Sequence, residues 1–378
     1  MLFTPSAATP DLWHYLASAD RAGRPIVMYG MGNGADKILA VCDRFGITVR
    51  DFFASDGFVR GHCFHGKRVL SFSETCERYG ADEMIVLLSF ASSRPEVLAL
   101  FDSVGATCEM YAPDVPVCGD NLFDADFYTA HRAEFDKARS LLADDESRRV
   151  FDGIVSYKLS GRIDILRATE SDAADAYRDI LHAEDLETVM DLGAYNGDSI
   201  RALREHAPRL ARVIAMEPDR RNARKLTEYA ARAAEEAPPL EITPVEAGAW
   251  SEEGVLYFDA SGNRNANLTP TATLHGAAAR LTEVKVNAPD TVALSTWGNR
   301  RVDHIKYDVE GAEAEALRGS RRLIERDRPA LLVSAYHRSE DLFALPLLVH
   351  ELCPSYRLYL RRMAGVPAWD INLYAVAE

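Results

Sequence analysis

Residues 189–200 read VMDLGAYNGDSI: an apolar run, an acid, two glycines four positions apart and an Asp-Ser pair. The apolar run predicts a buried β-strand, and the residues after the second glycine predict the start of a helix. In an open parallel sheet, ligands bind beyond the carboxyl ends of the strands, where helix N-termini present free N–H groups. This stretch therefore predicts a ligand-binding strand–loop–helix unit.

The loop itself has features that suit close contact with a ligand. Gly193 and Gly197 let the backbone approach a bound molecule, and Asp198 or Ser199 can cap the following helix. The loop residues that we expect to contact a cofactor are Gly193, Ala194, Tyr195, Asn196, Gly197 and Ser199.

Two acids indicate which cofactor the loop binds. Asp191 precedes the glycine pair, and Glu217 ends the next strand in VIAMEPD, where it can accept hydrogen bonds from both hydroxyls of a ribose. The glycine spacing is GxxxG and not the pyrophosphate fingerprint GxGxxG. Asp191 would repel a pyrophosphate but can reach the ammonium of a methionine moiety. The pattern therefore favours S-adenosylmethionine over NAD.

The adenine of that cofactor is expected near the end of the third strand of this series. Glu246 follows that strand and could accept a hydrogen bond from the exocyclic amine. The expected cofactor contacts outside the loop are Asp191, Glu217, Pro218, Glu246, Ala247 and Asp308.

The second half of the chain alternates strand and helix patterns and ends in two strand patterns joined by a short turn. Such alternation predicts a parallel sheet, and the closely joined final strands predict an antiparallel pair. Five parallel strands closed by such a pair are the arrangement of class I S-adenosylmethionine-dependent methyltransferases. The expected strands cover residues 188–193, 212–218, 240–250, 302–311, 329–337, 355–363 and 370–378.

The block VDHIKYDVEGAEAEALRG (302–319), together with VMDLGAYNGDS, AMEPD and the terminal INLYAVAE, resembles the FkbM family of methyltransferases. The resemblance covers roughly the last half of the chain. It implies methyl transfer from S-adenosylmethionine to hydroxyl oxygens of sugars or secondary metabolites. The chain departs from the family at Ser295 and Thr296, where an acid is usual.

A hydroxyl acceptor needs a base or a metal ion to gain alkoxide character. Asp308 and His337 end adjacent strands, and we predict that one of them is the catalytic base. Glu310 and Glu313 are predicted to contact the substrate, with a hydrogen-bonded structural role left open for His337. If a divalent metal is bound, its predicted ligands are Asp308, Glu310 and His337.

The segment 259–281 interrupts the strand pattern and is rich in Asn, Thr and Gly. We expect a surface loop that helps to select the acceptor, although a loop without a specific role remains an alternative. Its candidate hydrogen-bonding residues are Arg264, Asn265 and Asn267.

The first part of the chain has its own strand–loop–helix start, in RPIVMYGMGNGADKILAV. Gly30, Gly32 and Ala35 match GxGxxA, but Asp51 lies inside the next expected strand and Asp56 lies beyond it. A nucleotide or nucleotide-sugar site and a degenerate domain for substrate presentation or assembly both remain open. The expected strands cover residues 26–30, 47–55, 67–72 and 82–90.

These patterns divide the chain into three parts: a Rossmann-like α/β domain at 1–120, a helical connector at 121–170 and a methyltransferase domain at 171–378. The connector is rich in charge and has helical periodicity, so we expect it to bury one face against both neighbours. Two rival functions follow from the first part. One is an NAD-dependent or nucleotide-sugar enzyme, and the other is a non-catalytic assembly or glycan-binding protein.

Composition limits the partners. The formal net charge of −15 argues against general nucleic-acid binding, because phosphates would be repelled. There is no long uncharged apolar stretch and no signal-peptide pattern, so we expect a cytoplasmic protein. The six cysteines include no CxxC, which predicts neither disulfides nor a structural zinc site. We expect a small-molecule, sugar or nucleotide-sugar acceptor, and a homo-oligomer is left open.

Overall fold

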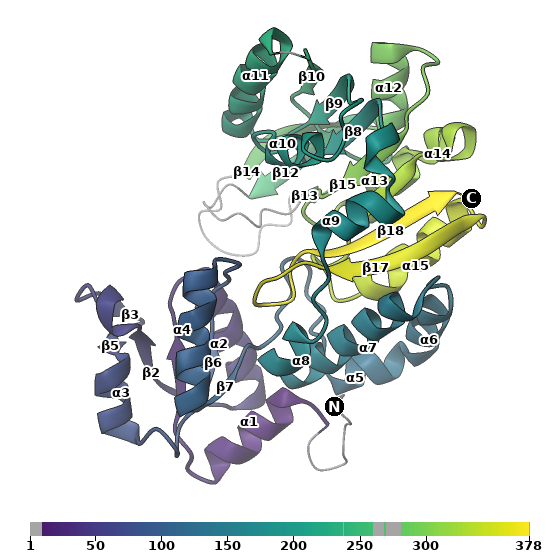
Figure 1. Cartoon of the computed structure of the whole chain (residues 1–378). Helices are drawn as coiled ribbons and strands as arrows, with labels where there is room; N and C mark the ends of the chain where they lie inside the picture. The colour runs from purple at the N-terminus through teal and green to yellow at the C-terminus, as the bar shows by residue number, and fades with distance from the viewer. Residues whose placement is uncertain (1–9, 237, 260–267, 270–280, 378) are drawn as a thin grey trace.

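The computed structural model describes residues 10–236, 238–259, 268–269 and 281–377. Two sheets dominate it, one in each half of the chain, with a group of helices between them (Figure 1). Both termini of the described chain lie on the side of the connector and second sheet (Figure 1).

The first sheet has five parallel strands in the order β5-β2-β1-β6-β7. The strand order reverses at β1, and the loop after β1 carries the glycines of the first GxGxxA pattern. The strands are β1 (Ile26–Tyr29), β2 (Val49–Ala54), β5 (Leu70–Ser71), β6 (Ile85–Leu88) and β7 (Glu109–Tyr111). The helices are α1 (Leu12–Arg21), α2 (Asn33–Phe45), η1 (Asp56–Phe58), α3 (Phe72–Tyr79) and α4 (Pro95–Thr107).

The strand expected at 67–72 is not a single strand. Strand β4 (Lys67–Arg68) pairs with β3 (Cys63–Phe64) in a small exposed hairpin. Of the expected strand, only Leu70 and Ser71, which form β5, join the main sheet. Ser71 then caps α3 in a capping box with Glu74, which ends the extended backbone. The expectation was wrong because the capping signal at 71–74 competes with the apolar alternation.

Helices between the two sheets form the connector: α5 (Ala125–Ala130), α6 (Arg132–Ser140), α7 (Asp145–Ser160) and α8 (Ile163–Arg167). Although one buried face was expected, α7 is buried on nearly all sides from Gly153 to Ser160. Even Lys158 is buried there, and its ammonium pairs with Asp114 at 2.8 Å. The connector side chains belong to one hydrophobic cluster that includes residues of both sheets.

The second sheet has seven strands in the order β10-β9-β8-β15-β16-β18-β17. The first five are parallel, and β18 pairs antiparallel with both β16 and β17, as the sequence predicts. The strands are β8 (Thr188–Leu192), β9 (Arg212–Met216), β10 (Glu241–Val245), β15 (His304–Tyr307), β16 (Ala330–Ser334), β17 (Tyr356–Arg362) and β18 (Ile371–Ala377).

Helices flank both faces of this sheet (Figure 1). A short helical stretch precedes it, made of α9 (Ala173–Asp175), a single π-helical turn η2 (Ala176–Ile180) and η3 (Ala183–Asp185). The remaining helices are α10 (Asp198–Arg204), α11 (Arg220–Glu235), α12 (Pro289–Trp297), α13 (Glu313–Gly319), α14 (Arg321–Asp327) and α15 (Asp341–Leu352).

A further small sheet, in the order β11-β14-β12-β13, occupies the region between the third and fourth main strands. Its strands are β11 (Gly248–Ala249), β12 (Gly254–Asp259), β13 (Leu268–Thr269) and β14 (Leu281–Asn287). The stretch expected as one strand at 240–250 is thus divided between the main sheet and this one.

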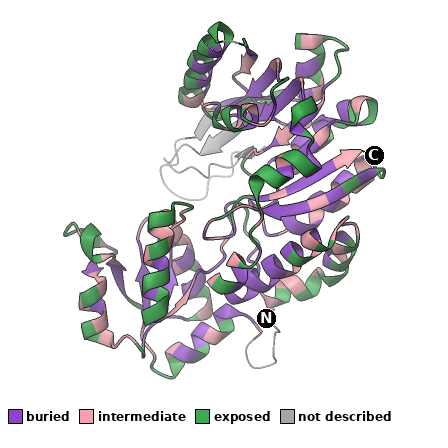
Figure 2. Ribbon diagram, in the orientation of Figure 1, coloured by how far each residue is buried: buried purple, intermediate pink, exposed green. Residues whose placement is uncertain are grey.

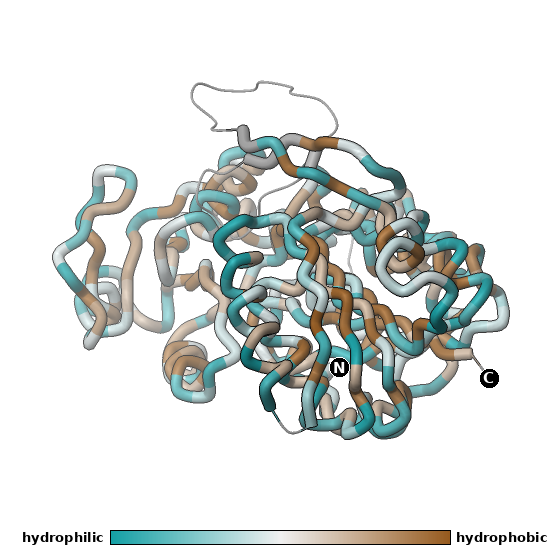
Figure 3. The backbone as a smooth tube through the Cα atoms, turned by 90° about the horizontal axis from the view of Figure 1, so that it is seen from above, coloured by the Kyte–Doolittle hydropathy of each residue, from teal (hydrophilic) through white to brown (hydrophobic). Residues whose placement is uncertain are grey.

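Burial follows the layers. The strands of both main sheets are mostly buried, whereas the helices expose one side (Figure 2). Seen from above, apolar stretches run along the interior strands, and the surrounding helices carry the hydrophilic segments (Figure 3). Among the described helices, none has the length and apolar character needed to cross a membrane.

Candidate active site

The second sheet brings three acids together at the carboxyl ends of neighbouring strands. Asp191 is the second-to-last residue of β8. Glu217 directly follows β9, and Asp308 directly follows β15. The backbone N–H of Asp308 donates to Leu192 O at 3.0 Å, which fixes the end of β15 beside the end of β8. The convergence follows from the parallel strand order, since such strands end at one edge.

Asp191 is buried and is only partly compensated. Its Oδ2 accepts a hydrogen bond from Ser199 Oγ at 2.6 Å, and its Oδ1 lies 3.5 Å from Lys306 Nζ. Oδ1 has no hydrogen-bond partner among the described residues. The expectation that Asp198 or Ser199 caps α10 is wrong, because the N-cap is Gly197 and makes no side-chain cap bond. Ser199 orients Asp191 instead.

The two loop glycines are required by packing within the chain. A Cβ on Gly193 would lie 1.9 Å from Asp308 O, and one on Gly197 would lie 2.5 Å from the Tyr229 ring. Both glycines also have positive φ, at 86° and 82°. The absence of side chains lets the loop lie against β15 and α11, and the close approach of its backbone to a ligand stays a prediction.

Glu217 is buried behind the loop and holds it in place. Its two carboxylate oxygens accept hydrogen bonds from Tyr195 N and Asp219 N, both at 2.8 Å. Burial raises the pKa of Glu217 to about 7, and those backbone donors only partly oppose the shift. The side chain therefore titrates near neutral pH.

The other predicted cofactor residues occupy different surroundings. Ala194 is fully buried, whereas Tyr195 is 41% exposed at the tip of the loop with φ of 46°. The Asn196 side chain accepts from Arg201 at 2.7 Å. Pro218 and Glu246 line one groove of about 1020 Å³ beside Glu217, and Ala247 is buried next to it.

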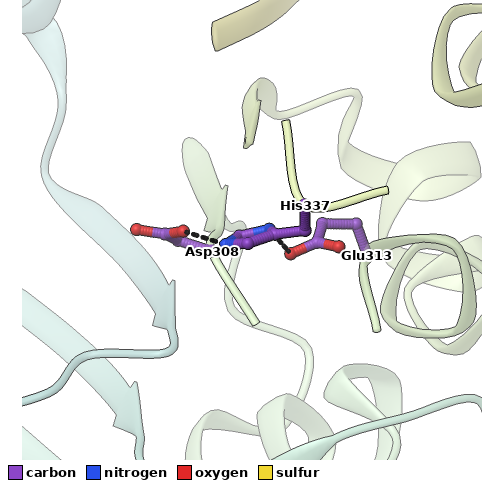
Figure 4. A group of neighbouring side chains, drawn as sticks. All are labelled: Asp308, Glu313 and His337. Carbon is purple, nitrogen blue, oxygen red and sulfur yellow. Dashed lines mark ion pairs between the residues drawn. The ribbon is translucent and has the colours of Figure 1, made fainter. Parts of the chain in front are cut away.

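The other end of the site is a row of three side chains, in which His337 lies between Asp308 and Glu313 (Figure 4). Asp308 follows β15, Glu313 is the first residue of α13, and His337 follows β16. His337 Nε2 lies 3.7 Å from Asp308 Oδ1, and His337 Nδ1 lies 2.9 Å from Glu313 Oε1. The imidazole is 1% exposed.

The surrounding charges set the protonation of this row. Burial disfavours a charged imidazole, but Glu313, Asp308 and Glu310 outweigh it and raise the pKa of His337 to about 10. Burial likewise opposes ionisation of Asp308, yet Lys306 and His337 hold its pKa at about 2. At neutral pH this arrangement holds an imidazolium next to a carboxylate.

Glu310 and Glu313, both predicted to contact the substrate, differ in access. The Glu310 side chain is 46% exposed and its Oε2 lies 3.6 Å from His337 Nε2. Glu313 is 1% exposed, and its Oε1 accepts from Val309 N at 2.9 Å and Gly311 N at 3.3 Å. Glu313 is enclosed by the turn that it stabilises, and its contact with the substrate stays a prediction.

The predicted acceptor-loop residues Arg264, Asn265 and Asn267 lie outside the described residues.

One residue of the site was missed. Lys306 points from β15 between Asp191 and Asp308, with its Nζ 3.2 Å from Asp308 Oδ2. Those two carboxylates raise its pKa against the effect of burial, so the ammonium stays charged. The signal was present in HIKYD, since a lysine inside a strand that is otherwise buried needs a charged partner.

These residues fit S-adenosylmethionine. A cavity of about 150 Å³ is lined by Asp191, Ser199, Lys306, Asp308 and Asp370, among others. The Asp191 oxygen without a hydrogen-bond partner suits an ammonium group, and Lys306 beside it suits a carboxylate, so the two match a zwitterionic amino-acid moiety. Glu217 is placed one strand further along, where a ribose would lie.

The first domain's loop has no comparable set of free acids. Asp51 accepts from Arg78 at 2.8 Å and from Tyr79 at 2.5 Å, and Asp56 accepts from the backbone and hydroxyl of Ser73. A Cβ on Gly30 would meet the Phe90 ring at 2.6 Å, so that glycine also serves packing. Asp51 and Asp56, the two acids that the sequence placed near this loop, are thus both bound within the first domain.

The strand order, the loop after β8 and the acids after β9 and β15 define a class I methyltransferase-like fold and site. A model of the methyltransferase FkbM domain matches residues 191–364. Residues 191–364 therefore form a methyltransferase domain of the FkbM family, which implies S-adenosylmethionine as the methyl donor.

The chain is similar to several solved structures, and the first of these supports the fold. The methyltransferase FkbM from Methylobacillus flagellatus KT has a TM-score of 0.74 at 21% identity, covering 99% of this chain and 94% of that chain. Precorrin-6y C5,15-methyltransferase from Geobacter metallireducens GS-15 has a TM-score of 0.33 at 9% identity, covering 55% and 93%. Aeropyrum pernix fibrillarin has a TM-score of 0.31 at 11% identity, covering 51% and 68%. No curated protein matches the chain.

Proposed function

We propose that this chain transfers a methyl group to a hydroxyl oxygen of a sugar, glycan or related small molecule. The observation that carries the proposal is the position of Asp308, which is beside the cofactor acid Asp191 on one side and the partly exposed Glu310 on the other. A hydroxyl bound there would lie between the methyl donor and a carboxylate. S-adenosylmethionine supplies the methyl group.

The proton of the hydroxyl needs an acceptor. Asp308 and His337 are the two candidates, and of these only Asp308 is free of a proton at neutral pH in this arrangement. Asp308 is a weak base, so positioning must contribute much of the rate. The charged His337 would stabilise Asp308 and orient it.

The acceptor is proposed to enter between the two sheets. A cavity of about 350 Å³ is lined by residues of the first domain and of the turn between β17 and β18. Lys37 lines this cavity. Burial lowers the pKa of its ammonium, and the negative charge of Glu310 partly opposes that shift, so the cavity lies within electrostatic reach of Glu310. Trp369, 40% exposed, offers an apolar surface on the opposite side. Such a cavity suits a sugar or nucleotide sugar.

Other expectations remain part of the proposal. Pro218, Glu246 and Ala247 would lie near the adenine, and Glu310 would contact the acceptor. The division at residues 120 and 170, a cytoplasmic location and self-association stay predictions.

The test is transfer of a radiolabelled methyl group from S-adenosylmethionine to a panel of free sugars and sugar nucleotides. We expect a base-stable methyl ether with at least one of them, and a loss of about 100-fold or more for Asp308→Asn. Glu315→Gln, on the solvent side of α13, is the matched control and should keep full activity. Transfer to nitrogen or carboxylate acceptors only would refute the hydroxyl assignment.

A further inference from the structure

Asp308 and Glu310 both place a carboxylate oxygen near Nε2 of His337. His337 Nε2 lies 3.7 Å from Asp308 Oδ1 and 3.6 Å from Glu310 Oε2. These separations are too long for hydrogen bonds. Neighbouring ligands that bind one divalent ion through bonds of about 2.1 Å lie roughly 3 to 3.5 Å apart. His337 Nε2 is thus only slightly farther from each carboxylate oxygen than two ligands of a common ion would be.

The side of His337 away from these atoms is built to orient it. Nδ1 faces Glu313 Oε1 at 2.9 Å, and that oxygen is fixed by the backbone N–H groups of Val309 and Gly311. A carboxylate behind a histidine fixes its ring orientation and tautomer in metal sites. Glu313 Oε2 is buried without a hydrogen-bond partner among the described residues, so the carboxylate is not fully satisfied in this state.

The two carboxylate oxygens of Asp308 face different groups. Its Oδ2 faces Lys306 Nζ at 3.2 Å, which leaves Oδ1 directed at His337. Tyr336 Oη lies 3.4 Å from Oδ1, which is a long hydrogen bond. An ion bound to Oδ1 could replace this hydrogen bond or coexist with it.

The backbone conformation at Glu310 sets the direction of its side chain. It has φ of 54°, an unusual value for a residue other than glycine, asparagine or aspartate, and it is followed by Gly311 with φ of 91°. Strained backbone of this kind is concentrated at functional sites. The strain directs a half-exposed carboxylate toward His337.

We propose that Asp308, Glu310 and His337 bind a divalent cation of the Mg²⁺ or Mn²⁺ type, with Glu313 as a positioning residue. Two carboxylates and one imidazole are ligands that Mn²⁺ accepts readily, and carboxylate with water suits Mg²⁺. The exposed side of Glu310 leaves coordination positions for water or an acceptor oxygen, as in catalytic sites.

The role of the ion rests on the proposed function, whereas its binding does not. A hydroxyl coordinated by a divalent ion loses its proton more readily, so that a weak base suffices. The proton would pass to Asp308 or to water, and no oxidant or reductant is needed.

The experiment measures Mn²⁺ binding to the untagged full-length protein by calorimetry and by the loss of the free Mn²⁺ signal in electron paramagnetic resonance. We expect one saturable site per chain. Glu310→Gln and His337→Gln should each weaken it at least 10-fold, while Glu315→Gln, which changes a surface acid of α13 paired with Arg318, should leave it unchanged. Thermal unfolding verifies that each variant is folded.

Binding of S-adenosylmethionine, measured in parallel, separates the two proposals. If that cofactor binds but Mn²⁺ does not, the metal inference is overturned and the proposed function stands. If Mn²⁺ binds equally well to wild type and Glu310→Gln, the ion lies elsewhere and the inference is also overturned. Site-dependent Mn²⁺ binding without methyl transfer to any hydroxyl would support the metal site and refute the proposed function.

Discussion

The chain contains two glycine-rich loops that look alike in sequence and differ in what surrounds them. Near the loop after β1, Asp51 and Asp56 are bound by Arg78, Tyr79 and Ser73. After β8, Asp191 keeps an oxygen without a hydrogen-bond partner among the described residues and lies beside Lys306. The comparison teaches that loops with similar glycine patterns can differ in whether the neighbouring acids are already bound within the protein.

The largest expected effect concerns Lys306, the lysine of β15 that lies beside the second loop. Lys306→Met removes the positive charge between Asp191 and Asp308 and leaves two carboxylates close together. Removing one partner of a buried ion pair costs about 3 kcal/mol or more. We expect a loss of that size in the free energy of unfolding, measured with urea at pH 7. An unchanged stability would show that Lys306 does not compensate these acids.

The loop glycines give the next comparison. Gly193→Ala places a Cβ 1.9 Å from Asp308 O at positive φ, so the backbone must shift and we expect a loss of about 3 kcal/mol. Gly32→Ala also has positive φ, at 95°, but its Cβ would meet nothing within 4 Å. We therefore expect only about 1 kcal/mol there. Equal losses in urea denaturation would contradict the packing role of Gly193.

Glu217, which follows β9, and Asp51, which lies inside β2, provide a test of cofactor binding. Glu217→Gln weakens hydrogen bonds to a charged group, so we expect S-adenosylmethionine affinity to fall by about 1.5 to 3 kcal/mol. Asp51→Asn in the first domain should leave that affinity unchanged, because Asp51 is bound by Arg78 and Tyr79. Calorimetric titration of both variants makes the comparison. A similar loss in Asp51→Asn would mean that the first domain also contributes to the cofactor site.

The smallest effect is a pH dependence. Burial raises the pKa of Glu217 to about 7, with Asp219 and Asp191 adding to the shift. Its carboxylate form, which accepts hydrogen bonds from the ribose, is therefore gained between pH 6 and pH 8, and cofactor affinity should rise about 10-fold over that range. Glu217→Gln should abolish the rise.

The same shift affects stability in the opposite direction. A carboxyl whose pKa is higher in the folded than in the unfolded protein stabilises the fold at low pH. In the protein without cofactor, this contribution is complete below about pH 4.5 and is lost as the pH rises through 7. Comparing wild type with Glu217→Gln by urea denaturation at pH 5 and pH 8 measures it.

Local patterns predicted much of this molecule. The apolar run ending at Asp191 and the spacing to Glu217 were sufficient to place the loop, and the short turn before residue 370 predicted the antiparallel strands β17 and β18. These features depend on neighbours within a few residues.

Other features depend on contacts between distant residues. Asp51 is bound by Arg78 and Tyr79, which come 27 and 28 positions later, and no local signal shows that pairing. Glu313 begins a helix, where an acid is usually exposed, yet it is enclosed once His337 approaches from β16. The protonation of His337 follows from that enclosure, so the sequence alone could not assign the base.

The shared core of the connector has a consequence for how the molecule unfolds. Because one continuous apolar cluster includes Tyr29 in β1, Tyr157 in α7 and Leu373 in β18, opening either half exposes surface of the other. Unfolding should therefore be cooperative, with one calorimetric transition for the whole chain. A fragment beginning at residue 171 would expose the apolar surface that the connector covers. We expect it to aggregate instead of forming a smaller working enzyme.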